Sequence, residues 1–338
     1  MYLFSSFDNN LMSKKYLIIQ TASLGDVILS LSLAESLHEF SEELEIDYMV
    51  KPEYAILFKN HLFIKNVHFF DRKLNKFKEV FRLLKLIRSM DYDAVFCVQR
   101  FFTAGLLTAF SKANIRSGFK KNPFSFLFTH SSEHSLNGLH EIERNHNLLA
   151  CIGINNMELP KLYCSPENFD TIAKYQNSEY VTIAPASLWK TKQFPEEKWV
   201  EFINKVSENI SVYITGGVED IALGEKIVTL TSRKNCFNLC GKLNIMESAA
   251  LMKGALMNYM NDSAPIHIAS AVNANTTAVF CSTIPKFGFR PLSSNNAIVE
   301  TDANLKCRPC GIHGRARCPE QHFNCAYSID IQKFIDRI

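Results

Sequence analysis

Short apolar runs alternate with amphipathic stretches along most of the chain. Residues 16–20 form the first run, a loop with the sequence TASLGD follows, and apolar residues then recur at helical spacing from Val27 to Leu37. This order predicts a strand, a tight loop and a helix. In the first half, further strands are predicted at 46–50, 67–70 and 94–98, and a helix over about 74–90.

The second half repeats this alternation after residues 160–168, whose Pro, Ser and Asn content indicates a linker or a surface crossing. Strands are predicted there at 180–184, 211–215, 256–260, 277–280 and 297–300. Continuous apolar strands that alternate with helices are typical of a parallel sheet covered on both faces. We therefore predict an α/β protein with two successive doubly wound domains.

Composition narrows the class of protein. The 338 residues are 47% hydrophobic and 21% charged, which excludes a largely disordered or fibrous protein. The net charge of +3 excludes a histone-like surface, so we expect no nucleic-acid partner. No apolar run reaches the length of about 18 residues that a membrane span needs. Residues 1–10 lack the features of a secretion signal, so we expect a cytoplasmic protein.

Basic residues concentrate in one part of the first half. Residues 51–150 hold 16 basic and 8 acidic side chains, whereas residues 1–50 hold 2 and 8. Within this part, residues 119–128 combine aromatic side chains with lysines. Such a segment is typical either of contact with a lipid surface or of a buried hairpin or loop.

The helix predicted over 74–90 is amphipathic. We expect its apolar set, which includes Phe77, Phe81 and Ile87, to face the core and its lysines and arginines to face solvent.

Asp26 stands in the loop TASLGD, directly after the first predicted strand. Ligands of open parallel sheets bind outside the carboxyl ends of the strands, so Asp26 is a candidate general base that faces a substrate. A carboxylate at this position can also simply cap the helix. The loop lacks the glycine series of dinucleotide-binding proteins and the lysine motif of P-loop NTPases, which argues against both classes.

A loop of the second half, residues 184–195, has small residues followed by lysines. We call it the phosphate loop, because its backbone amides, the Ser187 hydroxyl and the Lys192 charge are suited to holding a phosphate. A solvated lysine on a generic loop is the alternative.

Two further loops follow predicted strands. The glycines of TGGVED at 215–220 allow close approach of a ligand, and Glu219 can pair with a ribose, although a plain strand-to-helix turn explains the sequence equally well. In NDSAPIHIA at 261–269, Ser263 can cap a helix whose amides point at an anion. His267, one turn further on, either faces that anion or packs between helices.

Taken together, these segments resemble glycosyltransferase family 9, the ADP-heptose:lipopolysaccharide heptosyltransferases. The similarity rests on LIIQTASLGD at 17–26, on PAS and KQFP within the phosphate loop, and on NDSAPIH at 261–267. HEIER at 140–144 is similar to the family's segment near the end of the first domain. The resemblance covers nearly the whole chain, and the order of the motifs is more specific than any one of them.

The resemblance implies a GT-B fold, in which two Rossmann-like domains face each other across a cleft. Residues 14–170 would bind the acceptor and residues 171–338 the nucleotide sugar. It also implies an inverting transfer of heptose from ADP-heptose to the lipopolysaccharide inner core, with no cofactor or metal required for catalysis. The alternatives are a glycosyltransferase for another nucleotide sugar and a catalytically silent paralogue that binds nucleotide sugars.

The implied acceptor would hold the protein at the inner face of the inner membrane. There, the basic surface of the first domain would meet an anionic lipid.

Carried over position by position, the resemblance makes Asp26 the catalytic base and assigns Ser187 and Lys192 to the donor phosphates. Glu219 falls at the position of a ribose-binding carboxylate. The helix start beside the diphosphate corresponds to Asp262, Ser263, Ala264 and His267. The family usually has glycine at position 264, so the Ala264 methyl would crowd the donor unless φ is negative there. Because of Ala264, a catalytically silent paralogue remains an alternative.

Four cysteines gather near the end of the chain: Cys307, Cys310, Cys318 and Cys325. Four thiols within 19 residues can close a tetrahedral zinc site, although only the first pair has the usual ligand spacing. Free buried thiols and disulfides are the alternatives. Such a zinc ion would be structural, because four protein ligands leave no position open for catalysis.

Overall fold

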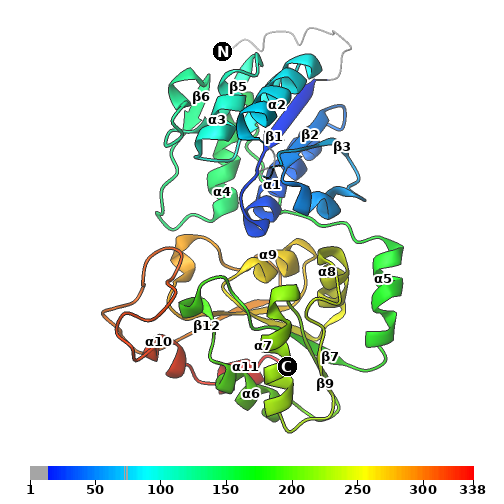
Figure 1. Cartoon of the computed structure of the whole chain (residues 1–338), viewed down its shortest axis with the longest axis vertical. Helices are drawn as coiled ribbons and strands as arrows, with labels where there is room; N and C mark the ends of the chain where they lie inside the picture. The colour runs from blue at the N-terminus through cyan, green and yellow to red at the C-terminus, as the bar shows by residue number, and fades with distance from the viewer. Residues whose placement is uncertain (1–13, 72, 74) are drawn as a thin grey trace, which may run out of the picture.

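The computed structural model describes residues 14–338 except 72 and 74, and it contains one parallel six-stranded sheet in each half of the chain (Figure 1). The expectations for residues 1–10 and for a helix start at Leu74 lie outside the described residues. The first sheet consists of β1 (Lys15–Ile19), β2 (Glu45–Val50), β3 (Ile64–Phe69), β4 (Ala94–Cys97), β5 (Ile115–Phe119) and β6 (His130–Ser132). The second consists of β7 (Tyr180–Ala184), β8 (Ser211–Ile214), β9 (Cys236–Asn238), β10 (Met257–Asn261), β11 (Thr276–Phe280) and β12 (Asn296–Glu300).

The two sheets share one topology. Their strand orders are β3-β2-β1-β4-β5-β6 and β9-β8-β7-β10-β11-β12, and all neighbouring strands are parallel. Counted within its own sheet, each order is 3-2-1-4-5-6, the Rossmann arrangement. Because the order reverses between β1 and β4 and between β7 and β10, a ligand crevice is expected at both places. The predicted α/β class with two doubly wound halves is confirmed.

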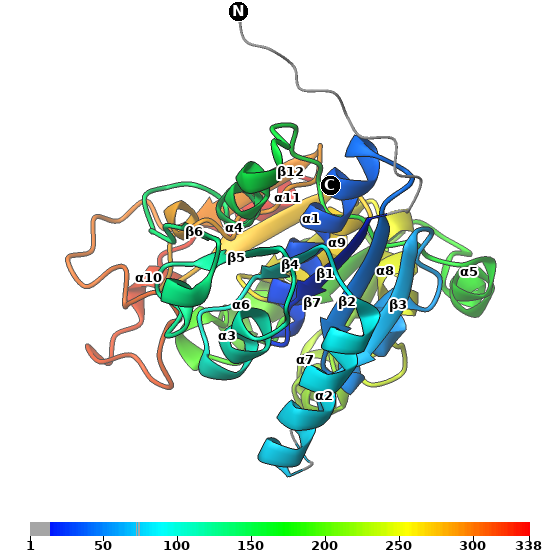
Figure 2. The same cartoon turned by 90° about the horizontal axis from the view of Figure 1, so that it is seen from above.

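Helices cover both faces of each sheet (Figures 1 and 2). The first half contains α1 (Leu24–Phe40), α2 (Lys76–Met90), α3 (Phe102–Ala109) and α4 (Glu141–His146). The second contains α5 (Pro166–Ile172), α6 (Glu196–Lys205), α7 (Ile221–Leu230), α8 (Ile245–Gly254), α9 (Ala264–Ala271), α10 (Asn324–Tyr327) and α11 (Gln332–Ile335). The predicted domain limit at residue 170 falls inside α5, which packs against α8.

Helix α1 joins the two domains through apolar contacts. Most of its residues are buried, because it packs on the first sheet and also along α9 of the second domain. One hydrophobic cluster accordingly contains Leu31 of α1, Met246 of α8 and Ile266 of α9. Figure 1 shows α1 and α9 facing each other where the domains meet. Burial of apolar surface therefore helps to set the relative position of the domains.

Helix α2 buries a different face from the predicted one. Phe77 and Phe81 are 85% and 78% exposed, whereas Leu83 and Ile87 are buried against the first sheet. The expectation for Phe77 and Phe81 is therefore wrong, and that for Ile87 is confirmed. Apolar residues occupy more than one face of this helix, so periodicity alone does not decide which face packs.

The aromatic segment 119–128 is partly buried and partly exposed. Phe119 ends β5 and is buried, and Asn122 below it is buried as well. The following 3-10 helix, η2 (Ser125–Leu127), is exposed at Phe126. No helix among the described residues has the length and apolar character needed to cross a bilayer.

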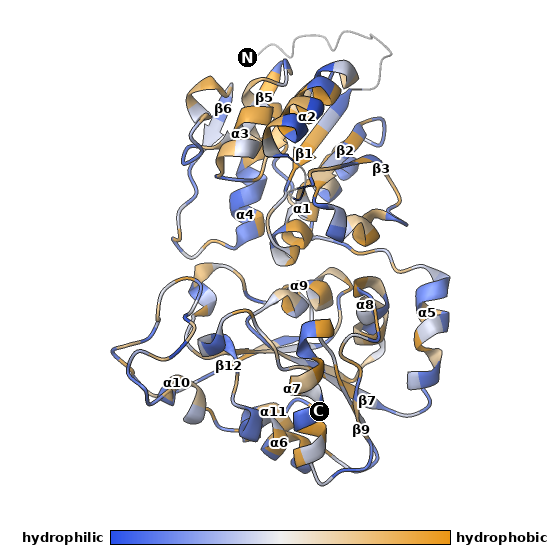
Figure 3. Cartoon of the chain, in the orientation of Figure 1, coloured by the Kyte–Doolittle hydropathy of each residue, from blue (hydrophilic) through white to orange (hydrophobic). Residues whose placement is uncertain are grey.

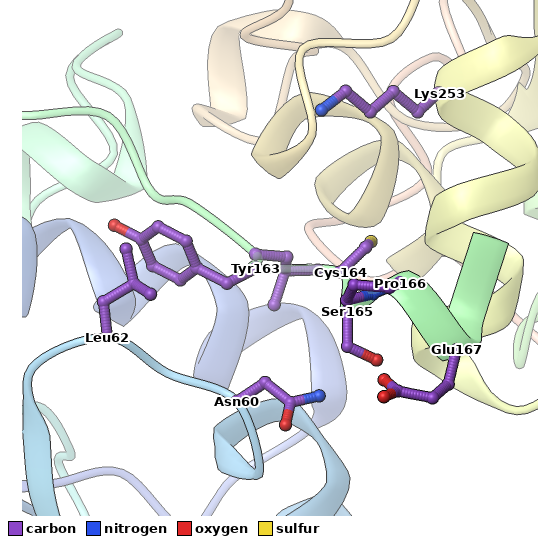
Figure 4. A pocket seen from close by; sticks show the side chains of 9 residues that line it. Asn60, Leu62, Tyr163, Cys164, Ser165, Pro166, Glu167 and Lys253 are labelled. Atoms are coloured by element: carbon purple, nitrogen blue, oxygen red, sulfur yellow. The ribbon is translucent and has the colours of Figure 1, made fainter.

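The predicted crossing at 160–168 runs from the first domain into α5. A pocket of about 500 Å³ opens beside it. Asn60 and Leu62 line the pocket from the first domain, and residues 162–167 and Lys253 line it from the crossing segment and α8 (Figure 4). None of the predicted site residues lines this pocket.

Candidate active site between the two domains

The predicted site residues lie at the carboxyl ends of strands, next to the two reversals of strand order. Asp26 follows β1, Ser187 and Lys192 follow β7, and Asp262 follows β10. Glu219 follows β8, the other neighbour of β7, and is exposed in a short 3-10 turn. From the sequence, we expect one carboxylate in the first domain to face an anion-binding wall in the second. The structure places these two groups of residues at the carboxyl ends of the central strands of the two sheets, where ligands of such sheets bind.

Asp26 lies in the first turn of α1 and forms a capping box with Ser23. The Ser23 hydroxyl and amide donate to Asp26 Oδ2 at 2.6 and 3.2 Å, and the Asp26 amide donates to Ser23 Oγ at 3.5 Å. Asp26 therefore caps helix α1, which is one of the two roles considered from the sequence. Capping does not exclude a role in catalysis, because the carboxylate is also electrostatically perturbed.

The pKa of Asp26 is raised above its ordinary value. Burial is the main cause and the negative charge of Glu141 adds to it, whereas the hydrogen bonds from Ser23 and the positive charge of Arg100 act in the opposite direction. A carboxylate with a raised pKa accepts a proton more readily than an ordinary aspartate, which suits a general base.

The start of α1 lies against the start of α9 in the other domain. A Cβ atom placed on Gly25 would lie 2.8 Å from His267 Cδ2 and 3.9 Å from Ala264 Cα. Glycine at position 25 therefore permits this close approach. The contact brings Asp26 beside the residues predicted to hold the donor.

Lys192 is held by a buried carboxylate. Its Nζ lies 2.8 Å from Asp262 Oδ2, and Thr283 Oγ1 donates to the same oxygen at 2.6 Å. Lys192 and Asp262 are both largely buried, so solvent screens their attraction only weakly. Asp262, predicted to contact the donor itself, thus fixes the position of the Lys192 ammonium group.

His267 is buried in the first turn of α9 and is neutral. Its pKa is lowered to about 3, chiefly by burial and to a smaller extent by the nearby His140 and Lys192. Its Nδ1 has no hydrogen-bond partner among the described residues. This nitrogen departs from the usual pairing of buried polar atoms, which is the kind of exception found at functional sites.

Ser263 precedes α9 but does not cap it as predicted. Its hydroxyl donates to the carbonyls of Ala186 and Asn261, both at 3.3 Å, and therefore links the phosphate loop to the α9 start. Ala264 opens α9 and is absent from the described residues with positive φ. Its methyl group is consequently compatible with the backbone, and glycine is not required there.

Asn261 belongs to the NDSAPIHIA motif, but the sequence does not single it out as a site residue. Its Oδ1 accepts from the Phe194 amide at 2.9 Å, and its Nδ2 donates to the Pro185 carbonyl at 2.5 Å. Gln193 Nε2 donates to the Ser187 carbonyl at 2.6 Å. These bonds fix both ends of the phosphate loop. The signal was present in the sequence as an amide at the end of an apolar strand.

A buried ionic cluster near Asp26 was also missed. Arg144 Nε donates to Glu141 Oε2 at 2.8 Å, and His134 Nε2 lies 3.0 Å from Glu141 Oε1. Burial acts to raise the Glu141 pKa, but the His134 hydrogen bond and the charges of both neighbours together lower it. Glu141 is therefore an ionised neighbour of Asp26. The HEIER motif contains Glu141, but the sequence does not show which charged residues surround this side chain.

Residues 140–144 also form hydrogen bonds to the second domain. The Glu141 amide donates to the Gly288 carbonyl at 2.8 Å, and Arg144 Nη2 donates to the Phe287 carbonyl at 2.9 Å. His140 accepts from the Ile142 amide at Nδ1, so its Nε2 carries the proton that it donates to the Arg290 carbonyl at 2.9 Å. We call these contacts the interdomain clamp.

The sequence matches the model of one protein family, described as glycosyltransferase family 9 (heptosyltransferase), over residues 80–317. This match spans more than half of the chain.

The protein belongs to glycosyltransferase family 9.

Relatives of this glycosyltransferase match along most of their length. Lipopolysaccharide heptosyltransferase 1 of Campylobacter coli is 22% identical over 315 residues, which cover 86% of this chain and 90% of the relative. Lipopolysaccharide heptosyltransferase 3 of Escherichia coli (strain K12) is 24% identical over 289 residues, with coverage of 80% and 83%.

Solved structures show the same fold. E. coli ADP-heptose lps heptosyltransferase II superposes with a TM-score of 0.79 at 19% identity, covering 96% of this chain and 97% of that chain. E. coli heptosyltransferase WaaC with ADP gives a TM-score of 0.71 at 18% identity, with coverage of 95% and 99%. The predicted GT-B fold and the predicted enzyme class, a glycosyltransferase, are confirmed.

In this glycosyltransferase, residues 307–318, which we call the cysteine loop, pack on the phosphate loop. The Arg315 amide donates to Thr191 Oγ1 at 2.7 Å, and the Thr191 amide donates to the Arg315 carbonyl at 3.0 Å. A Cβ atom on Gly314 would lie 2.9 Å from Lys192 Cγ. The cysteine loop therefore supports the main chain and the stem of Lys192.

The four clustered cysteines are free thiols: Cys307, Cys310, Cys318 and Cys325. The pKa of the Cys325 thiol is raised to about 11, chiefly by burial and also by the other three thiols, so the four interact electrostatically. Within the described part of the chain, however, no three His, Cys, Asp or Glu side chains are placed to hold a metal ion. The structure thus offers no ligand geometry for zinc, and the structural metal stays a prediction.

Proposed function

We propose that this protein transfers heptose from ADP-heptose to the inner core of lipopolysaccharide. Membership of a family described as heptosyltransferase supports the reaction. The relatives named lipopolysaccharide heptosyltransferases support the acceptor, and a neighbour solved with ADP supports the donor nucleotide. The observation that carries the proposal is that the turn bearing Asp26, whose pKa is raised, packs through Gly25 on His267 of the other domain, which in turn lies near Lys192.

In the proposed reaction, Asp26 removes the proton from an acceptor hydroxyl as that oxygen attacks the anomeric carbon of the donor. The new bond joins this carbon to the acceptor oxygen. The bond to the diphosphate oxygen breaks on the opposite face, and its electron pair leaves with ADP. A single displacement of this kind inverts the anomeric configuration.

The second domain supplies the charge stabilisation that the departing diphosphate needs. Lys192 offers a positive charge, Ser187 a hydroxyl and His267 a neutral ring. Asp262 keeps the ammonium group oriented before the donor arrives. These groups suffice to propose a reaction without a catalytic metal. Glu219, at the neighbouring strand end, is proposed to bind the ribose hydroxyls.

We infer a working place at the inner surface of the inner membrane, where a lipid-linked acceptor is presented. The excess of basic side chains in residues 51–150 supports this inference, because that membrane surface is negatively charged.

The reaction is tested by incubating the purified protein with heptose-free acceptor glycolipid and ADP-heptose, ADP-glucose or UDP-glucose in turn. Mass spectrometry should show the addition of one heptose with ADP-heptose alone, unchanged by a chelator. Nuclear magnetic resonance of the product should show an anomeric configuration opposite to that of the donor. Transfer from UDP-glucose but not from ADP-heptose would refute the proposed donor, and retention would refute the single displacement.

A further inference from the structure

The first domain carries a group of large apolar side chains, exposed except for the half-buried Phe124, which we call the aromatic patch. Its residues come from α3, from the residues just before and after α3, and from the turn around η2: Phe101, Phe102, Phe110, Phe124, Phe126 and Leu127. The ring of Phe124 lies 4.9 Å from that of Phe102 and 6.3 Å from that of Phe110, measured between centroids, so the two segments form one surface.

The patch is accessible and apolar enough to interact with another molecule. Phe101 is 61% exposed and Phe126 is 78% exposed. Figure 3 shows α3 as a mostly hydrophobic helix on the outside of the first domain. Contiguous apolar surface of this kind, unlike single exposed apolar residues, marks an interaction site.

The charge around the patch indicates which partner it fits. Residues 94–132, which carry the patch, include five basic residues and no acidic one. Arg88 Nε donates to the Phe110 carbonyl at 2.8 Å, and Arg116 Nε donates to the Leu127 carbonyl at 3.3 Å. Two guanidinium groups are thereby fixed at the edge of the patch. Aromatic side chains can enter the apolar interior of a bilayer, and positive charges fixed beside them can contact its anionic headgroups.

The patch is rigidly connected to the active site. Asn122 is buried, and its Nδ2 donates to the carbonyls of Gln99 and Phe101, both at 3.1 Å, which ties the η2 turn to the end of β4. Arg100, between these two residues, is close enough to Asp26 to influence its charge. Arg100 therefore lies both next to Phe101 of the patch in the chain and within electrostatic reach of Asp26.

We propose that the aromatic patch docks the first domain on an anionic bilayer, with Phe101 and Phe126 inserted among the lipids and Arg88 and Arg116 at the headgroups. This orientation places the Asp26 side of the cleft at the membrane surface. The docking itself needs no substrate. Only its use, the delivery of a lipid-linked acceptor, rests on the proposed function.

The docking is tested by sedimentation with vesicles of phosphatidylethanolamine and phosphatidylglycerol, against vesicles of phosphatidylethanolamine and phosphatidylcholine. The wild-type protein should bind the anionic vesicles and lose binding as salt is raised. The double variant Phe101→Ser/Phe126→Ser should bind about tenfold more weakly or worse, because two exposed rings no longer enter the lipid. The control Phe40→Ser/Leu230→Ser removes two similarly exposed side chains elsewhere and should bind like the wild type.

Activity separates docking from catalysis. The Phe101→Ser/Phe126→Ser variant should act like the wild type on a water-soluble, deacylated acceptor and lose activity on acceptor embedded in vesicles. Unchanged vesicle binding by this variant would overturn the proposal, even if heptose transfer is confirmed. A wild-type dimer in analytical ultracentrifugation that the variant dissociates would also overturn it, because a second copy would then cover the patch. Docking without any transfer would instead overturn the proposed function and leave the docking surface supported.

Discussion

At the scale of single residues, the site combines a carboxylate made more basic with a lysine held in place. The surroundings of Asp26 act in both directions, since Glu141 raises its pKa and Arg100 lowers it. Lys192 depends on Asp262, which in turn is bonded to Thr283. Single substitutions of these neighbours therefore test how they affect Asp26 and Lys192.

The pH dependence of kcat/KM should respond to these two charges in opposite directions. Asp26 must be deprotonated to act as a base, so activity falls as the pH drops through its pKa. Removing the negative charge in Glu141→Gln lowers that pKa and moves the acidic limb to lower pH. Removing the positive charge in Arg100→Gln raises it and moves the limb to higher pH. Shifts of both limbs in the same direction would contradict this assignment.

Replacement of Lys192 should slow the chemical step. Lys192→Met removes the positive charge proposed to face the diphosphate and should lower kcat by about 100-fold or more. Lys190→Met is the matched control, because Lys190 is exposed on the same loop and pairs only with Gln193 Oε1 among the described contacts, at 3.0 Å. Equal losses in the two variants, measured with saturating donor, would show that the position of Lys192 is not special.

At the scale of elements, the long apolar strands and the loops after them were predictable from sequence. The strand predicted at 180–184 is β7, and the loops bearing Asp26 and Lys192 follow β1 and β7 as expected. Short or mixed elements were not found: β5, β6, β9 and α3. Their hydrophobic signal extends over too few residues, or is interrupted by polar ones, to stand out from loops.

Contacts between distant segments were beyond sequence reasoning. The buried face of α2, the bond from Ser263 to Ala186 and the grip of Arg144 on Phe287 all depend on which elements pack together. The residues proposed to bind substrate lie in sequence motifs, whereas the residues that position them come from segments far apart in the sequence. The sequence therefore predicts Lys192 as a phosphate-binding residue, but it does not predict that the cysteine loop supports this side chain.

Two glycines of the cysteine loop test that support. Gly311 and Gly314 both have positive φ, so alanine strains the backbone at either position. A Cβ atom at Gly311 meets nothing within 4 Å, whereas one at Gly314 lies 2.9 Å from Lys192 Cγ. Gly314→Ala should therefore weaken ADP binding in calorimetry more than Gly311→Ala does, with similar loss of thermal stability. Equal donor affinity in the two variants would indicate that the loop does not position Lys192.

At the scale of the whole molecule, two Rossmann domains are in direct contact. Apolar packing of α1 along α9 and the interdomain clamp hold the domains together. The proposed site requires both domains, because Asp26 belongs to one domain and Lys192 and His267 belong to the other. Binding of the donor and catalysis should therefore be separable by changes at the domain contact.

The contact between Gly25 and His267 tests this separation. The methyl group of Gly25→Ala would press on the His267 ring and hold the domains apart, so kcat should fall about tenfold, and more than donor affinity does. His267→Ala removes the ring, and the double variant should then lose less than the sum of the two single effects on the transition-state free energy. Strict additivity in this cycle would refute contact of the two positions during turnover.

The most direct measurement is single-turnover heptose transfer by Asp26→Asn, with donor affinity measured in parallel. Asparagine keeps an oxygen acceptor for the Ser23 hydrogen bonds but cannot accept the acceptor proton at neutral pH. The variant should bind ADP-heptose like the wild type, keep its thermal stability, and transfer heptose about 100- to 10,000-fold more slowly. Transfer at the wild-type rate would contradict the central claim that Asp26 is the base of this glycosyltransferase.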